Sequence, residues 1–173
     1  MLILGKSAHR LSIDIDVICP PGTNIEDYLK SFADFGFINL ELVERKQRDD
    51  ADIPKSHSKF FYQIAYRNDT DAQSYILLDV LYEDIHYFQT RQTAIDCPFI
   101  RLEGEPLMVT VPSAEDILGD KLTAFAPNTT GIPYYKNGRS CSMEIAKQLY
   151  DVGRLFENIS GLQITAEAFR KIA

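Results

Sequence analysis

Alternating apolar and polar residues near the N-terminus predict a half-buried β-strand over residues 11–19. Through Val17 the alternation is strict, so that Asp14 and Asp16 fall on the polar face of the strand. The turn-forming triplet Pro20-Pro21-Gly22 then ends the strand.

The pattern up to residue 111 predicts one helix and otherwise strands. The helix begins at Thr23 or Asn24, runs to about Phe35 and has Gly36 at its C-terminal cap. Polar, mixed-charge residues over 45–59 predict a hairpin loop or a longer excursion, and residues 67–72 predict a turn. Strands are predicted over residues 37–44, 60–66, 75–82, 99–102 and 107–111.

Helical patterns follow from residue 113 onward. Ser113 with Asp116 is a helix start of the capping-box type, and the helix should reach about Phe125. A second helix is predicted over 142–156, and Thr165 should cap a third. Strands with one early helix, followed by helices, indicate an α+β fold with a helical C-terminal part.

Composition and charge exclude several classes of protein. The 173 residues include 18 Lys and Arg against 25 Asp and Glu, a net charge of −7. This balance argues against a basic nucleic-acid coat and against binding to anionic membranes, although it allows a local basic groove. No stretch reaches the ~20 apolar residues of a membrane span, and the apolar start is too short for a signal peptide. We therefore expect no membrane partner and a cytoplasmic protein.

Asp14 and Asp16 are the first candidates for chemistry. Residues two apart on a strand share a face, which puts their backbones ~6–7 Å apart. Such a pair can hold one or two Mg²⁺ ions through carboxylate oxygens. The alternative is a solvated strand face that carries two acids.

Asp79 lies within the apolar strand predicted over 75–82. A carboxylate there is costly unless a metal, a basic group or hydrogen bonds compensate it, so a structural ion pair is the alternative. Together with Asp14 and Asp16, it would complete a site for two metal ions ~4 Å apart that binds a nucleoside triphosphate as its Mg²⁺ complex.

These motifs resemble those of the nucleotidyltransferase superfamily, and most closely the AbiEii/AbiGii toxin family. The run Arg10-Leu-Ser-Ile-Asp-Ile-Asp16 resembles the strand motif of the family. The segment 111–124 resembles the helix that carries its lysine, which would be Lys121, and 147–152 resembles its last motif, with Asp151 at the second acid. Asp79 fits the third carboxylate.

The resemblance implies a mixed β-sheet with flanking helices, as in the catalytic domain of DNA polymerase β. Residues 1–111 would form this core, and residues 112–173 a helical part packed on it as a single compact unit. Two Mg²⁺ ions and a nucleoside triphosphate are implied, with Asp14 and Asp16 as metal ligands. Asp79 would be a metal ligand or the general base. Lys121 would contact the triphosphate, and Asp151 would orient Lys121 or the base.

Phosphate-binding residues are also implied by the resemblance. The family usually has a Gly-Gly-(Thr/Ser) element well upstream of the two aspartates, whereas here only Gly5-Lys6-Ser7 precedes them. Either Ser7 and its neighbours take over the nucleotide contact, or the element is absent through truncation or a late start. Ser12 either bonds phosphate or faces solvent. Gln148 replaces the first acid of the last motif.

The function implied is transfer of a nucleoside monophosphate to an acceptor hydroxyl by a toxin of a toxin–antitoxin pair. RNA, and tRNA in particular, is the acceptor suggested by the family, and an antitoxin protein is the implied partner. The alternative is a catalytically inactive relative that binds a nucleotide or a protein.

Three further features allow a simpler explanation. Asp151 and Lys147 are spaced as a local helical ion pair. His57 shows no ligand spacing and is expected in a core or surface role. The segment Tyr134-Tyr135-Lys136 either stacks on a nucleobase or anchors a loop with its rings.

Overall fold

The computed structural model describes residues 2–10, 12, 14–42, 55–63, 73–126 and 131–173. The chain divides into two compact units. Residues Ser12–His86 form one, here called the sheet unit. The other, the helical unit, combines Met1–Leu11 with Tyr87–Ala173. The boundary expected between residues 111 and 112 stays a prediction.

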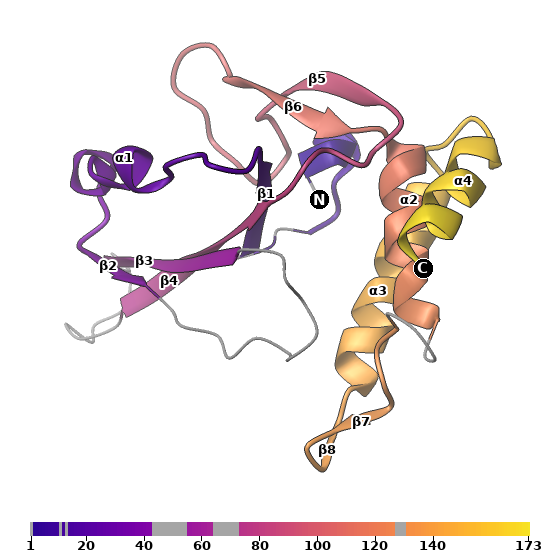
Figure 1. The fold of residues 1–173 in the computed structure, drawn as a ribbon. Helices are drawn as coiled ribbons and strands as arrows, with labels where there is room; N and C mark the ends of the chain where they lie inside the picture. Colours follow the sequence, from indigo (N-terminus) through magenta and orange to yellow (C-terminus); the bar gives the residue numbers. More distant parts are fainter. Residues whose placement is uncertain (1, 11, 13, 43–54, 64–72, 127–130) are drawn as a thin grey trace. The chain divides into compact units, whose positions relative to one another are not determined.

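The sheet unit contains a four-stranded mixed sheet (Figure 1). Its strands lie in the order β1-β4-β3-β2, with β1 and β4 parallel and the other neighbours antiparallel. The strands are β1 (Asp14–Cys19), β2 (Asn39–Leu42), β3 (Lys55–Gln63) and β4 (Gln73–Tyr82). Together with the helices, this sheet confirms the α+β class.

The helix predicted up to Phe35 is broken into two short pieces. They are α1 (Glu26–Leu29) and the 3₁₀ turn η2 (Phe32–Phe35), and Leu29 is the only residue of either that is buried. So little buried apolar surface cannot hold a longer helix, since helices in proteins depend mainly on packing. Gly36 does occupy the predicted cap, at φ 84°.

Strand β3 starts earlier than the sequence pattern predicts. Residues 55–59 were expected in a loop because all five are polar, yet they pair with β4. Ser58, in this polar stretch, is 2% exposed. The predicted loop over 45–54, the end of the strand predicted over 60–66, and the turn over 67–72 lie outside the described residues.

Three helices pack together in the helical unit, and α2 packs against both of the others. Leu118 and Leu155 are fully buried in its core, where Leu4 and Ala8 from the N-terminal segment join them. The elements are η1 (Leu2–Ser7), β5 (Thr90–Ala94), β6 (Met108–Pro112), α2 (Ala114–Leu122), η3 (Thr123–Phe125), β7 (Tyr135–Lys136), β8 (Arg139–Ser140), α3 (Ser142–Phe156) and α4 (Gln163–Ile172). None of the helices described is long and apolar enough to cross a membrane.

The predicted start of α2 is confirmed in detail. The Ser113 hydroxyl oxygen accepts a hydrogen bond from the backbone N–H of Asp116 at 3.0 Å. The buried Asp116 carboxylate in turn accepts from the backbone N–H groups of Phe88 at 2.8 Å and Gln89 at 2.9 Å. This one carboxylate therefore ties the start of α2 to the segment that leads into β5.

Two other expectations for this unit are wrong. Residues 99–102 form no strand, and β6 pairs instead with β5, which the pattern did not predict. Thr165 lies inside α4 rather than at its cap, because its hydroxyl donates to the carbonyl of Glu115 in α2 at 3.1 Å. The position of Thr165 is set by a contact between two helices, and a local sequence pattern carries no information about such a contact.

Gly119 allows α2 and α4 to approach closely. A Cβ at Gly119 would lie 2.6 Å from both the Cβ of Ala168 and the carbonyl oxygen of Thr165. Gly119→Ala is therefore expected to lower the free energy of unfolding by about 1–3 kcal/mol through overpacking. In α3, where Gly153 has no atom within 4 Å of such a Cβ, the same substitution should raise it by about 0.5–1 kcal/mol. Chemical denaturation measures both, and equal effects would contradict the packing argument.

Candidate functional site

The acidic residues of the sheet unit lie on one face of adjacent strands. In the parallel pair of β1 and β4, Asp16 is the direct partner of Asp79, and Asp14 is the partner of Leu77. Register partners share a face, and so do residues two apart, so all three acids are on the same side. Asp14 and Asp16 are exposed, and the Asp79 side chain is 24% exposed.

His57 on β3 contacts the third acid from the other side. It is the register partner of Asp79, and its Nδ1 donates a hydrogen bond to Asp79 Oδ1 over 2.8 Å. An ionised carboxylate only accepts, so this nitrogen carries the proton. The contact was not foreseen, because the sequence pattern predicts a loop at residue 57. Even a correct strand prediction at 55–59 would not have placed His57 beside Asp79, because that also requires the register of β3 against β4.

The donor chemistry of these three acids suits a hard divalent cation, which prefers carboxylate oxygens. Their backbones are brought together by the register of β1 and β4. The side chains themselves are not gathered: among the described residues, no three His, Cys, Asp or Glu side chains form a group that could hold a metal ion. The metal ligands therefore remain a prediction.

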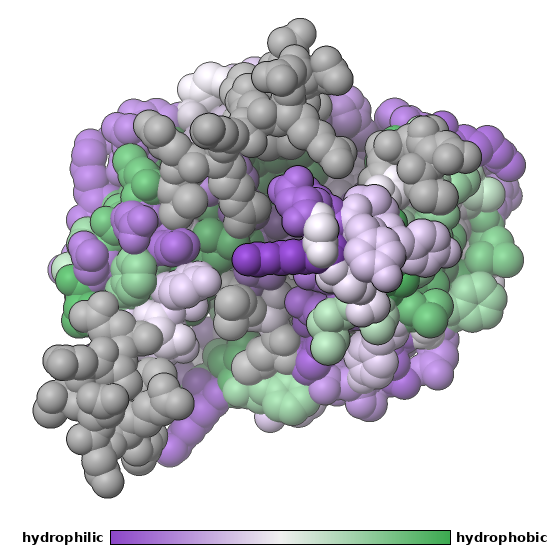
Figure 2. Space-filling view, turned by 90° about the horizontal axis from the view of Figure 1, so that it is seen from below, coloured by the Kyte–Doolittle hydropathy of each residue, from purple (hydrophilic) through white to green (hydrophobic). Residues whose placement is uncertain are grey.

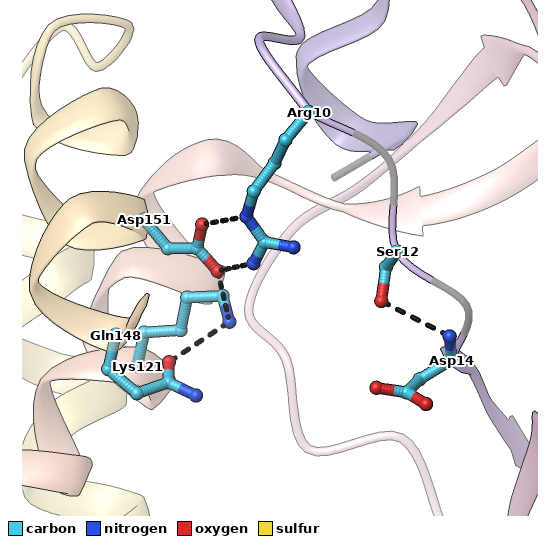
Figure 3. A network of polar contacts seen from close by, with 6 residues as sticks. All are labelled: Arg10, Ser12, Asp14, Lys121, Gln148 and Asp151. Carbon is cyan, nitrogen blue, oxygen red and sulfur yellow. Dashed lines mark hydrogen bonds and ion pairs between the residues drawn. The ribbon is translucent and has the colours of Figure 1, made fainter. Parts of the chain in front are cut away.

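A second polar cluster lies in the helical unit, around Asp151 on α3 (Figure 3). The Asp151 carboxylate accepts two hydrogen bonds from Arg10, at 3.1 Å from Nε and at 2.6 Å from Nη2. Its Oδ2 also lies 3.3 Å from Nζ of Lys121 on α2. Asp151 is 2% exposed, which makes it a buried counter-ion shared by two cations.

Gln148 completes this cluster. Its Oε1 accepts a hydrogen bond from Lys121 Nζ over 3.2 Å, so Lys121 is held by two residues one turn apart on α3. The local pair with Lys147 is not what holds Asp151, because its carboxylate is engaged by Arg10 and Lys121. The role of Arg10 was not foreseen, since it lies 141 positions from Asp151 and no periodicity joins them.

The two serine candidates fall in different units. Ser12 is exposed, and its Oγ accepts a hydrogen bond from the backbone N–H of Asp14 over 3.2 Å, which fixes the entry into β1. Ser7 is exposed at the end of η1 in the helical unit. Their assignment to the nucleotide stays a prediction.

A polar cavity of about 270 Å³ adjoins Lys121 in the helical unit. Asp120, Lys121 and Gln148 line it, together with Thr123 and Ile132. Burial raises the pKa of Asp120, and the Tyr87 hydroxyl, which donates to its carboxylate over 3.3 Å, together with the neighbouring Lys121 charge, opposes this rise. This carboxylate is thus the one in the cavity whose charged form the fold disfavours.

The raised pKa of Asp120 predicts a pH-dependent stability. Between the unfolded pKa and the raised folded pKa, the folded state binds more protons, so stability falls as pH rises through this window. Asp120→Asn, which keeps an acceptor for Tyr87, should therefore stabilise the protein at neutral pH. The gain should shrink as pH falls toward the ordinary range of an aspartate. Thermal melts of both proteins across this pH range measure the difference.

Glu115, on the same helix, provides a control of opposite sign. A hydrogen bond from the backbone N–H of Ser160, over 3.0 Å, lowers the pKa of Glu115. Its contribution to stability is therefore present above the unfolded pKa and is lost as pH falls through the lowered one. Glu115→Gln should not stabilise at neutral pH, and a stabilisation matching that of Asp120→Asn would refute the assignment.

Comparison with known proteins identifies the family of the chain. No match was found among curated proteins or among solved structures. A family model described as the nucleotidyl transferase AbiEii toxin of the type IV toxin–antitoxin system matches residues 1–173, the whole chain. The chain therefore belongs to the AbiEii family of nucleotidyl transferase toxins.

Proposed function

We propose that the protein transfers a nucleoside monophosphate from a nucleoside triphosphate to an acceptor hydroxyl, with Mg²⁺ bound at Asp14, Asp16 and Asp79. The observation that supports this proposal is the parallel register that pairs Asp16 with Asp79 and leaves Asp14 on the same face, in a chain of a nucleotidyl transferase family.

The chemistry is an in-line displacement. The acceptor oxygen attacks the α-phosphorus, the bond from that phosphorus to the bridging oxygen breaks, and pyrophosphate leaves with the electron pair. Bound divalent ions supply a more acidic hydroxyl and neutralise charge on the leaving group. The proton of the hydroxyl passes to the Asp79 carboxylate or to water, depending on whether Asp79 is the general base or a metal ligand.

His57 is proposed to position Asp79. Its hydrogen bond to Oδ1 restrains the rotation of the Asp79 carboxylate and so limits the positions that Oδ2 can take. The His57 side chain is 14% exposed, so the packing around it limits its own movement as well.

Lys121 is proposed to bind the triphosphate. Asp151 and Gln148 hold Nζ through two of its three protons, within 3.3 Å and 3.2 Å. A restrained ammonium loses less side-chain entropy when it meets a phosphate oxygen. Asp151 would therefore act through Lys121, as a positioning residue.

The remaining assignments follow from the family. Its toxin–antitoxin name suggests an antitoxin protein as a partner, and we propose RNA, including tRNA, as the acceptor. We also propose that Ser7 and Ser12 contact the nucleotide and that the protein acts in the cytoplasm.

Label transfer from α-³²P nucleoside triphosphates tests the function. Each of the four triphosphates is incubated with total RNA, with Mg²⁺ or with excess chelator, and labelled RNA is resolved on a gel. We expect Mg²⁺-dependent labelling that the double change Asp14→Asn with Asp16→Asn abolishes. Transfer by this double variant at the wild-type rate would refute the carboxylate assignment.

A second candidate is a catalytically silent protein that binds a nucleotide or a protein partner. Gln148, in place of the first acid of the last motif, favours it. A thermal-shift screen of nucleotides with and without Mg²⁺ separates the two functions. A metal-dependent shift without label transfer supports the silent protein, whereas no shift with any nucleotide contradicts both.

A further inference from the structure

The hairpin of β7 and β8 presents two cations side by side. Its two-residue turn is Asn137-Gly138, at φ 51° and 76°, the positive values of the type I′ turn that fixes such a hairpin. Lys136 and Arg139 are register partners directly beside this turn. Both are exposed, and neither forms an ion pair within the part of the chain that the structure describes.

Directly opposed like charges destabilise a hairpin unless an anion lies between or beside them. The protein as a whole carries a net charge of −7, so a pair of exposed, adjacent cations is opposite in sign to its overall charge. Their position beside a rigid turn restricts the movement of their backbones. This pair therefore provides a local site for an anion such as a phosphate.

An apolar cavity of about 390 Å³ lies where the hairpin meets α3. Tyr134 and Tyr135 border it on the hairpin side, and Ile145, Ala146 and Leu149 border it on the helix side. The two tyrosine side chains are 76% and 71% exposed, which leaves ring surface open to a ligand. The volume lies in the range of small-ligand pockets. Figure 2 looks from below onto the end of the helical unit that carries the hairpin, where hydrophilic and hydrophobic surfaces adjoin.

We propose that this hairpin and the adjoining cavity bind an unpaired nucleotide of a single-stranded nucleic acid. The base stacks on Tyr134 or Tyr135 at the cavity, and the phosphates on either side of it contact Lys136 and Arg139. Aromatic rings interleaved with cations are the combination that binds single strands with little sequence preference. An apolar protein segment would use the rings and the apolar wall, but it would leave the opposed cations without an anion.

The inference does not depend on catalysis, because the hairpin residues are separate from the acids and the lysine assigned to transfer. It does extend the proposed function, since a nucleic-acid acceptor needs a binding surface. If the hairpin does not bind oligonucleotides, label transfer to RNA can still occur. If label transfer does not occur, oligonucleotide binding at the hairpin can still be measured.

Fluorescence anisotropy with labelled ten-nucleotide oligo-dT and oligo-rA, at low salt, tests the site. Tyr134→Ala with Tyr135→Ala should weaken binding by about 5-fold to 150-fold, the usual loss for one stacked base. Lys136→Gln with Arg139→Gln should weaken it too. It should also reduce the dependence of log K on log salt by about 0.7 for each phosphate that the variant no longer neutralises.

Matched controls separate a local site from a general effect. Phe156→Ala removes another exposed ring of α3, and Arg170→Gln removes another exposed cation of the helical unit. Both should bind as the wild type does. Circular dichroism checks that every variant is folded, and the charge variant serves as the test if the tyrosine variant is not.

Three results would overturn the site. The first is that the wild type binds neither oligonucleotide, and the second is that the hairpin variants bind as tightly as the controls. The third is that a duplex of the same length competes as well as the single strand, because paired bases cannot stack on the tyrosines. If the hairpin variants lost a protein that co-purifies with the wild type but still bound the oligonucleotides, the surface would be assigned to a protein partner instead.

Discussion

Asp16→Asn is expected to reduce nucleotide transfer at least about a hundred-fold without unfolding the sheet unit. Asp16 is the register partner of Asp79, so its carboxylate is the one best placed to share a cation with β4. Loss of a metal ligand removes several kcal/mol of transition-state stabilisation, and 1.36 kcal/mol corresponds to tenfold in rate. The rate of label transfer at saturating triphosphate measures the loss.

Stability distinguishes a missing ligand from a damaged fold. Facing acids repel one another, so Asp16→Asn should leave the free energy of unfolding without Mg²⁺ within about 0.5 kcal/mol of the wild type, or raise it. Added Mg²⁺ should stabilise the wild type but not the variant, because a ligand stabilises the state that binds it.

Glu41→Gln is the matched control for this prediction. Across the sheet, Asp14, Leu77, Lys59 and Glu41 are successive register partners, so they lie on the same face. Glu41 is therefore an exposed acid on the face of Asp14, at the opposite edge of the sheet. Its removal should change neither transfer nor the Mg²⁺ shift. An equal loss in both variants would mean that overall negative charge, and not a ligand, matters.

Asp151→Asn should lower the free energy of unfolding by about 3 kcal/mol. The change leaves Arg10 and Lys121 without the carboxylate they share, and removal of one partner from a buried ion pair typically costs about 3–5 kcal/mol. The lower end applies because the two cationic side chains are 29% and 25% exposed and regain some hydration. Urea denaturation followed by circular dichroism measures the change.

Two comparisons test the assignment of this loss. Asp27 forms an exposed pair with Lys30, and Asp27→Asn should change stability by no more than about 0.5 kcal/mol. Arg10→Gln combined with Asp151→Asn should cost less than the sum of the single changes, since the double variant no longer has a guanidinium that has lost the Asp151 carboxylate. Strict additivity would mean that Arg10 and Asp151 do not stabilise each other.

Sequence patterns predicted those helices and strands whose own residues show a periodicity or a cap. The alternation before Cys19 located β1 and put Asp14 and Asp16 on one face. The Ser113 cap located the start of α2. The polar start of β3 was missed, because pairing with β4 and not its own pattern makes it a strand.

The geometry of the candidate site depends on contacts between distant residues, and these could not be predicted. That Asp79 lies on a strand was clear from its apolar neighbours, but its pairing with Asp16 and its hydrogen bond to His57 depend on register. Arg10 and Asp151 meet only when both ends of the chain fold together. Such contacts leave no periodic signal in a single sequence.

The helical unit is built from both ends of the chain, and this has a consequence for its synthesis. Leu4 and Ala8 leave the ribosome long before Leu155, their partner in the core. At roughly 5–20 residues per second the delay is about 7–30 s. Late in that interval the nascent sheet unit has all of its strands, which end at Tyr82, whereas the core that Leu4 and Ala8 join still lacks Leu155. A ribosome that stalls before α3 should therefore hold a chain whose first ten residues are open to proteases and chaperones.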